Sequence, residues 1–247
     1  IGNDLMPIEI VYSFALQKKA AAISNIALKK LDINLGEKII ETCDEILSGK
    51  HDDHFPLSVW QTGSGTQTNM NVNEVIANRS NELFGEKLGK YSPIHPNDHC
   101  NMGQSSNDSF PTVIHLTIID ITKKKLIPCL KKFIKKLEEK KREFDEIIKI
   151  GRTHYQDATP LTLGSEFGAF ESQVTNSLMR IEKAQEELLY LAQGGTAVGT
   201  GLNSSKDFSN GFLKALEKMT GIKFKQSKNY FESLSSHEPI LNFSSAI

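Results

Sequence analysis

The sequence predicts a mainly α-helical fold, in which an N-terminal helical domain is followed by a bundle of long helices. Apolar residues recur every three or four positions over long stretches, and the apolar/polar alternation typical of strands is nearly absent. The 247 residues are 38% hydrophobic, which is enough to bury a core and excludes a disordered or fibrous chain.

The first two helices are expected over residues 8–31 and 35–47. Apolar side chains in the first range follow helical spacing behind Pro7, a residue favoured at the start of a helix. Ser48-Gly49 supplies a stop signal for the second helix. Both helices therefore belong to the N-terminal domain.

Two polar stretches follow these helices. Residues 51–73 are rich in Gly, Ser, Thr, Gln and Asn and show little periodicity. Residues 89–109 contain Pro93, Pro96 and Gly103, which predicts a loop. We expect ligand-binding groups in these stretches, because no helix face requires so many polar side chains.

Long amphipathic helices dominate the rest of the chain. One is expected over 111–145, where Pro128 should kink the helix without ending it. A second is expected over 160–192 and a shorter one over 207–219. Helices this long pack as near-antiparallel bundles, and their apolar edges often meet another subunit.

The composition narrows the function classes. Lys+Arg total 29 and Asp+Glu total 30, and this balance argues against nucleic-acid or membrane-surface binding. The lysines of residues 123–136 are followed by glutamates, which favours a solvated helix face. Three widely spaced cysteines and no apolar run of ~20 residues favour a reduced, cytosol-like compartment without a membrane span. The first residues carry no secretory signal pattern.

The sequence contains no clear linker between domains. The best boundary is near residue 104, where loop-rich sequence gives way to long helices. We therefore expect an N-terminal domain over 1–104 and a long-helix domain over 105–247.

The first candidate segment runs from Gln61 to Glu74. Its two glycines allow backbone N–H groups to approach a ligand closely, and Ser64 and Thr66 add hydroxyl donors. Such a loop before a helix is consistent with an anion site, although the same residues also suit a plain polar turn. On this segment alone, both interpretations remain open.

The second candidate segment runs from His95 to Asp108. His95, Asp98 and His99 have a spacing that binds a metal ion only on a helix, and Pro96 argues against a helix there, so we expect no metal. The segment ends in hydroxyl and amide side chains at the mouth of the long helix, where a carboxylate is favoured. These side chains belong to Ser105, Ser106 and Asn107.

The third candidate segment covers residues 151–160, in a short loop expected between the two long helices. It contains His154 beside Thr153. A solitary loop histidine is usually an ordinary surface residue, but in a pocket with hydroxyl donors it becomes a candidate proton carrier near neutral pH.

Together the three segments resemble the signature regions of the fumarase/aspartase superfamily. The strings GSGTQ-TNMNVNEV, HPNDHCN-x-x-QSSNDSFPT and GRTHYQDATPLTLGSE are similar to class II fumarate hydratase. Met6-Pro7, HDDHFPLSVWQTGSGTQ and GGTAVGTGLN (194–203) extend the resemblance over nearly the whole chain. Aspartate ammonia-lyases are also similar, but His154 and the SGTQ wording favour the hydratase.

The resemblance implies reversible hydration of fumarate to L-malate, a tricarboxylic acid cycle reaction, through an aci-carboxylate and without a metal or organic cofactor. By the same resemblance His154 handles the proton of the hydroxyl group or attacking water. The implied substrate-binding residues are Ser64, Gly65, Thr66, Ser105, Ser106, Asn107 and Thr153. A second dicarboxylate site is implied at His95, Pro96, Asn97 and Asp98.

The resemblance also implies a homotetramer whose sites combine segments from different subunits. Its location is expected to be cytoplasmic, or the mitochondrial matrix in a eukaryote. The family's mobile Gly-Ser-Ser-x-Met-Pro-x-Lys-x-Asn-Pro loop is not found in residues 1–247, and its small C-terminal domain is expected to be missing too. We therefore expect this stretch alone to be inactive. Two alternatives remain open: an aspartate ammonia-lyase-like enzyme and a non-catalytic helical assembly module.

Overall fold

The computed structural model describes residues 3–247, which form two compact units. The first unit comprises Ile1–Thr117 with Leu188–His237, and the second comprises Ile118–Glu187 with Glu238–Ile247. The domain boundary expected near residue 104 stays a prediction.

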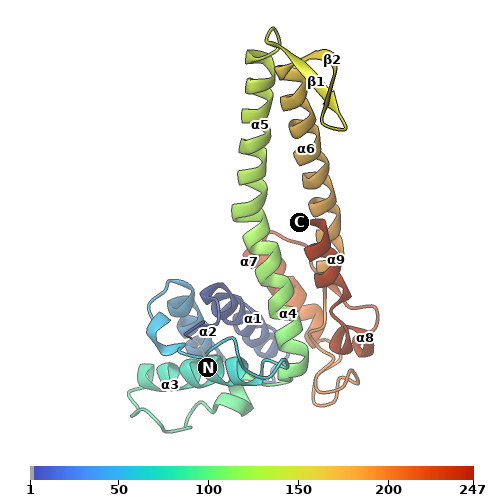
Figure 1. Cartoon of the computed structure of the whole chain (residues 1–247). Coiled ribbons are helices and arrows are strands. Elements are labelled where there is room, and N and C mark those ends of the chain that lie inside the picture. Colours follow the sequence, from blue (N-terminus) through green and yellow to red (C-terminus); the bar gives the residue numbers. More distant parts are fainter. Residues whose placement is uncertain (1–2) are drawn as a thin grey trace. The chain divides into compact units, whose positions relative to one another are not determined.

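Helices form the core of the first unit. Three of them, α1 (Ile8–Ala27), α2 (Ile33–Leu47) and α3 (Thr66–Leu83), pack against one another, and α7 (Phe208–Thr220) packs on α1 (Figure 1). Their contact faces bury aliphatic and aromatic side chains, which stabilise the unit by removing apolar surface from water. Among these core residues are Val11, Phe14, Ile39, Ile46, Val72 and Ile76.

Local chemistry sets the ends of the first two helices. The helix expected over 8–31 ends at Ala27, because Lys29 adopts a left-handed backbone with φ +55°. Asp32 then caps α2 by accepting hydrogen bonds from the backbone N–H groups of Asn34 and Leu35.

The polar stretches contain more regular structure than their composition suggests. Helix α3 begins inside the first stretch, and a π-helical turn (Pro96–Cys100) lies in the segment expected to be loop. Helix α4 (Ser106–Ile121) begins five residues before the expected start at Pro111, which lies inside it. The unit also contains a short 3-10 turn (Asp52–His54) and helix α8 (Tyr230–Ser235). A two-stranded parallel sheet pairs β3 (Tyr190–Leu191) with β4 (Lys225–Gln226).

Two long helices form most of the second unit. Helices α5 (Ile127–Glu143) and α6 (Leu163–Leu188) lie side by side in Figure 1, and α9 (Glu238–Ala246) also belongs to this unit. The ring of Phe144, which follows α5, lies edge-on to Phe167 of α6 with 5.1 Å between ring centroids. This arrangement confirms the predicted amphipathic long helices.

Pro128 interrupts regular hydrogen bonding without ending the helical run, as expected. A π-helical turn (Thr122–Leu126) joins α4 to α5, and Pro128 occupies the first turn of α5. Proline has no backbone N–H, so one helical hydrogen bond is missing here, and the wider π turn accommodates that loss.

A β-hairpin connects α5 to α6, where the sequence predicted only a short loop followed by a helix from residue 160. Strands β1 (Ile148–Thr153) and β2 (Gln156–Thr162) pair antiparallel, from Ile148 opposite Thr162 to Thr153 opposite Gln156. The hairpin is a correction to the prediction. Its residues are mostly exposed and Pro160 lies within β2, so neither alternation nor strand propensity marks it.

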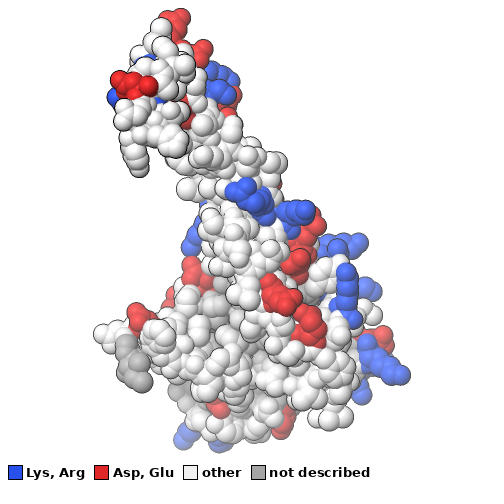
Figure 2. Space-filling view, turned by 45° about the vertical axis from the view of Figure 1, so that its right-hand side comes forward, with Lys and Arg blue, Asp and Glu red and all other residues white. Residues whose placement is uncertain are grey.

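Basic and acidic side chains share the helical surface. Lys124 pairs with Asp120, Lys136 with Glu139 and Lys140 with Glu143. Figure 2 shows Lys and Arg next to Asp and Glu on the face it presents. The lysine-rich run of residues 123–136 therefore lies on a charge-balanced helix face.

Across the described part of the chain, no helix has both the length and the apolar character required to cross a bilayer.

Candidate functional site

A hydroxyl cluster lies at the start of α3. The hydroxyl oxygens of Thr62 and Ser64 are 3.1 Å apart, and those of Ser64 and Thr66 are 3.3 Å apart. The Thr62 hydroxyl donates to Oε1 of Gln67 at 2.8 Å, which ties the loop to the first turn of the helix. Gly65 caps α3 with φ +67°. The three residues predicted from the first segment, Ser64, Gly65 and Thr66, are thus held at a helix N-terminus, where the backbone favours an anion.

Gly65 also brings the first signature segment against the second. A Cβ atom at this position would lie 2.2 Å from Cγ of Phe110 in α4, far inside van der Waals contact. Phe110 in turn stacks on Phe14 of α1 with 6.2 Å between ring centroids. Only glycine allows both the left-handed backbone and this close approach.

The start of α4 is held by polar contacts with neighbouring segments. The hydroxyl of Ser106 accepts a hydrogen bond from Nδ2 of Asn69 at 2.9 Å. Nδ2 of Asn107 donates to the carbonyl oxygen of Ala197 at 2.7 Å, and the backbone N–H of Asn107 donates to the hydroxyl of Ser105 at 3.3 Å. The three predicted residues Ser105, Ser106 and Asn107 therefore have defined positions.

Asp108 anchors the second segment to the glycine-rich segment 194–203. Its fully buried carboxylate accepts backbone N–H groups of Ser105, Gly194 and Thr196, each at 2.9 Å. Burial raises the pKa of Asp108, while these three N–H groups act in the opposite direction. Sequence reasoning assigned Asp108 no role, although it lies within the QSSND string.

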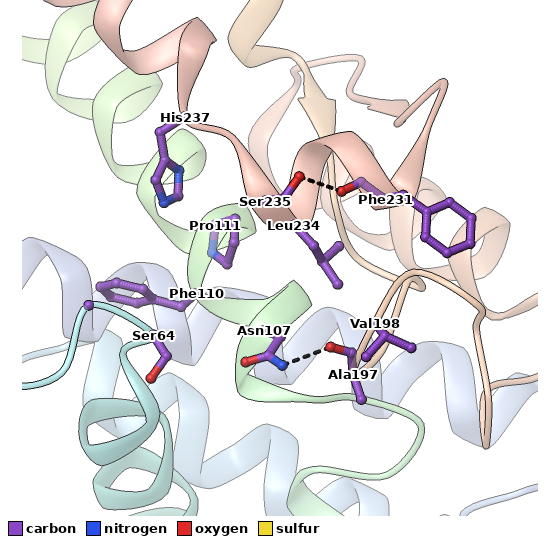
Figure 3. Close-up of a pocket in the computed structure, with 11 residues that line it drawn as sticks. Ser64, Asn107, Phe110, Pro111, Ala197, Val198, Phe231, Leu234, Ser235 and His237 are labelled. Atoms are coloured by element: carbon purple, nitrogen blue, oxygen red, sulfur yellow. Dashed lines mark hydrogen bonds between the residues drawn. The ribbon is translucent and has the colours of Figure 1, made fainter.

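These contacts border a cavity of about 250 Å³ within the first unit (Figure 3). Ser64 comes from the loop before α3, and Asn107 with Phe110 comes from α4. The other side is formed by the glycine-rich segment and by residues at and just after α8. Those residues are Ala197, Val198, Phe231, Leu234, Ser235 and His237. The cavity suits a small polar molecule with an apolar middle, since hydroxyl and amide groups line it beside aromatic and aliphatic ones.

Sequence reasoning missed the α8 side of this cavity, including His237. No motif marked residues 230–237, because the hydroxyl, imidazole and apolar side chains there have no distinctive spacing.

Thr153 and His154 belong to the second unit, in the β1–β2 hairpin. His154 and Tyr155 form its two-residue turn, and both have left-handed backbones, with φ +48° and +61°. Such turns favour Asn-Gly, so two large side chains here are strained. Tyr155 is 99% exposed, and His154 is exposed too.

The predicted second dicarboxylate residues form a compact π-helical turn. Nδ1 of His95 accepts backbone N–H groups from Asn97 and Asp98, both at 3.2 Å, and Nδ1 of His99 accepts the N–H of His95 at 2.8 Å. His95 also meets Tyr91 edge-on, with 5.2 Å between ring centroids. Because Nδ1 of His95 acts as an acceptor, its Nε2 carries the hydrogen and can donate to an anion.

Among residues 3–247, no group of three or more His, Cys, Asp or Glu side chains is arranged to hold a metal ion.

Comparison with known proteins decides the family. The sequence model of a family described as "Lyase" matches residues 5–247. The chain belongs to this lyase family. The relatives that follow agree with the resemblance to class II fumarate hydratase seen in the sequence.

Curated relatives are about 50% identical to this chain over the residues that align. The class II fumarate hydratase of Brucella suis is 53% identical over 243 residues, covering 98% of this chain and 52% of the relative. The mitochondrial fumarate hydratase of Saccharomyces cerevisiae is 50% identical over 246 residues, covering 100% of this chain and 50% of the relative. The chain thus spans about half the length of the curated relatives it matches.

A solved structure of the family has the same fold. The class II fumarase of Schistosoma mansoni superposes with a TM-score of 0.96 at 42% identity, covering 98% of this chain and 54% of that one. The mainly helical, fumarase-like fold predicted from the sequence is therefore confirmed.

Proposed function

We propose that the protein to which these residues belong catalyses the reversible hydration of fumarate to L-malate. The observation that carries the proposal is the cavity in which Ser64 and Asn107, from two separate signature segments, lie together. Identity of 50–53% to curated fumarate hydratases supports the same chemistry.

We propose that the polar groups around this cavity bind the substrate carboxylates. Hydroxyl and amide donors on two helix N-termini stabilise negative charge without a metal, provided that they are held rigidly. The proposed binding residues of the first unit are Ser64, Gly65, Thr66, Ser105, Ser106 and Asn107. Thr153 of the second unit is proposed as a further binding residue, contributed by another subunit. The turn of His95, Pro96, Asn97 and Asp98 is proposed as a second dicarboxylate site, in which Nε2–H of His95 donates.

In the hydration direction, His154 takes a proton from the attacking water while the water oxygen bonds to one alkene carbon of fumarate. The electron pair of the double bond moves onto the neighbouring carboxylate, giving the aci-carboxylate, and a proton then adds to the second alkene carbon. Water supplies the OH group and, in balance, one proton. The donors at the two helix N-termini act on the aci-carboxylate, where charge increases most.

We further propose a homotetramer, in which Thr153 and His154 complete sites with segments from other subunits. The half-exposed side chains of Phe133, Phe170 and Met179 on α5 and α6 support association of the long helices. The proposed location is the cytoplasm, or the mitochondrial matrix in a eukaryote. The name of the yeast relative includes the word mitochondrial, which supports a mitochondrial location in a eukaryote.

The test follows the ultraviolet absorbance of fumarate after L-malate is added to the full-length protein, with L-aspartate in a parallel reaction. We expect absorbance to rise with malate only. His154→Asn should lower kcat roughly 10²–10⁴-fold. His54→Asn, which changes an exposed histidine of the 3-10 turn, is the matched control and should leave kcat unchanged.

Two results would replace the proposal. Fumarate formed from aspartate would indicate an ammonia-lyase. No turnover with either substrate would indicate a helical assembly module.

A further inference from the structure

A lysine is buried beneath the second signature segment. Lys18 of α1 is 1% exposed, and its ammonium group donates to Oδ1 of Asn101 and Oε1 of Gln104, both at 2.9 Å. Both acceptors are neutral amides. A cation removed from water in this way is costly, so its retention requires a reason beyond packing.

The two amides connect Lys18 to the proposed substrate site. Oδ1 of Asn101 also faces Nδ2 of Asn69 at 3.4 Å, and that same Nδ2 donates to the hydroxyl of Ser106 at 2.9 Å. Gln104 directly precedes Ser105, and its Oε1 accepts a second hydrogen bond from Gln17 at 2.9 Å. A short path of polar contacts therefore runs from Lys18 to the start of α4.

The orientation of each amide in this path is determined by its partners. The Nδ2 group of Asn101 points to Oδ1 of Asn97 and the carbonyl of Gln104, at 3.5 and 3.4 Å. The Nε2 group of Gln104 donates to the carbonyls of Cys100 and Met102, both at 3.2 Å. Both amide oxygens are thereby turned toward Lys18, which fixes the backbone of residues 100–104 around one cation.

We propose that Lys18 is a positioning residue, which holds the Ser106 hydroxyl and the N-terminus of α4 in place to bind a substrate carboxylate. This inference rests on the proposed function. Lys18 acts through Asn101 and Asn69 and does not touch the substrate.

The buried charge gives Lys18 a second effect on the same site. In an interior of low dielectric, its ammonium favours a dianion at the start of α4 more strongly than a surface lysine could. The groups that act on Lys18 electrostatically are Cys43 of α2, Cys100 of the π-helical turn and Asp108 of α4. Burial raises the pKa values of both thiols, that of Cys100 to about 12, so they stay neutral near pH 7.

Burial lowers the pKa of Lys18 to about 7. Its charge is therefore lost as the pH rises through 7, and carboxylate binding should weaken over the same range. A lysine that only fills space would produce no such dependence.

The neighbouring lysine provides a matched control. Lys19 lies on the same helix but pairs at the surface with Asp44, at 2.5 Å. Lys18→Met and Lys19→Met therefore make the same chemical change inside and outside the network. The measurements are kcat and KM for fumarate from pH 6 to 8.5, and the inhibition constant of succinate, on the full-length protein.

We expect Lys18→Met to raise the KM for fumarate and the inhibition constant of succinate roughly ten-fold at pH 6.5, with a smaller change in kcat, since ground-state carboxylate binding is lost. The wild-type protein should bind less tightly as the pH rises through 7, and Lys18→Met should remove this dependence. Lys19→Met should match the wild type.

A double-mutant cycle tests whether Lys18 acts through Ser106. If it does, Lys18→Met should have little further effect in a Ser106→Ala background. Asn101→Ala removes the shared acceptor at a partly exposed position and should raise KM in the same way, which keeps the test valid if Lys18→Met does not fold.

A Lys18→Met protein with the KM and pH profile of Lys19→Met would overturn the inference, and so would additivity with Ser106→Ala. A wild-type protein without turnover would instead overturn the proposed function itself.

Discussion

The close approach between Gly65 and Phe110 makes Gly65→Ala a sharp test of how the site is assembled. The new Cβ would lie 2.2 Å from Cγ and 2.4 Å from both Cδ atoms of the Phe110 ring. It would also carry a side chain at φ +67°. Gly65→Ala therefore combines a steric clash with Phe110 and a strained backbone conformation.

General values for the two effects set the expected loss of stability. A non-glycine residue in the left-handed region costs about 1–2 kcal/mol. Forcing a methyl group into a packed aromatic contact costs about 1–3 kcal/mol, because the ring must move off Phe14 or the loop must shift. We expect Gly65→Ala to lower the free energy of unfolding by about 2–5 kcal/mol.

Gly85→Ala separates the two penalties. Gly85 has φ +83°, but no atom lies within 4 Å of the position that a Cβ would occupy there, so only the backbone cost applies. Thermal unfolding of both variants, with KM for fumarate measured in parallel, is the assay. The reasoning is refuted if Gly65→Ala is no less stable than Gly85→Ala. We also expect Gly65→Ala alone to raise KM, since Phe110 lines the cavity beside Ser64.

Three further predictions concern buried or paired ionisable groups. Hydrogen bonds from Arg79, and then from Lys50 and His51, hold the pKa of Glu45 well below its usual range, so Glu45→Gln should lower Tm by about 4 °C at pH 7 and by less at pH 4. Burial lowers the pKa of His115 to about 4, so its imidazole should stay neutral in NMR titrations down to that pH. Asp108→Asn turns an amide N–H₂ toward backbone N–H donors and should cost about 1–3 kcal/mol in thermal unfolding.

The depressed pKa values of Glu45 and His115 both make the fold less stable as the pH falls. A depressed carboxylate pKa stabilises the fold above the unfolded value of about 4.5, and this contribution is lost as the pH falls. A depressed histidine pKa likewise removes stability as the pH falls from about 6.5 to 4, because only the unfolded chain takes up the proton.

Controls and contrary results complete these tests. Glu41→Gln, which removes the partner of Lys38 from a half-exposed pair, should change Tm little. Equal effects of Glu41→Gln and Glu45→Gln on Tm would contradict the prediction for Glu45. A titration of His115 near pH 6.5 would contradict the prediction for that residue. Asp207→Asn changes an exposed carboxylate whose side chain caps no helix, and an equal loss there would contradict the third.

Helical periodicity was sufficient to predict the long helices, because their apolar stripes face a partner helix over many turns. It was insufficient for α3, whose buried face carries polar side chains. Asn81 is 1% exposed there and bonds the backbone of Lys90 and Ile94. A buried amide that hydrogen-bonds backbone groups belongs to the core as much as leucine does, but a hydropathy pattern counts it as a polar surface residue.

The wording of the motifs was enough to indicate the family and to nominate Ser64, Ser106, Asn107 and His154, since these depend on residue identity alone. Tertiary structure was needed for everything that depends on proximity between distant segments. Examples are the close approach of Gly65 to Phe110, the hydrogen bond from the backbone of Gly194 to Asp108, and the polar contacts that connect Lys18 to Ser106. The physical reason is that spacing along a chain encodes which face of a helix a residue occupies, whereas burial and hydrogen-bond partners are set only when separate elements pack together.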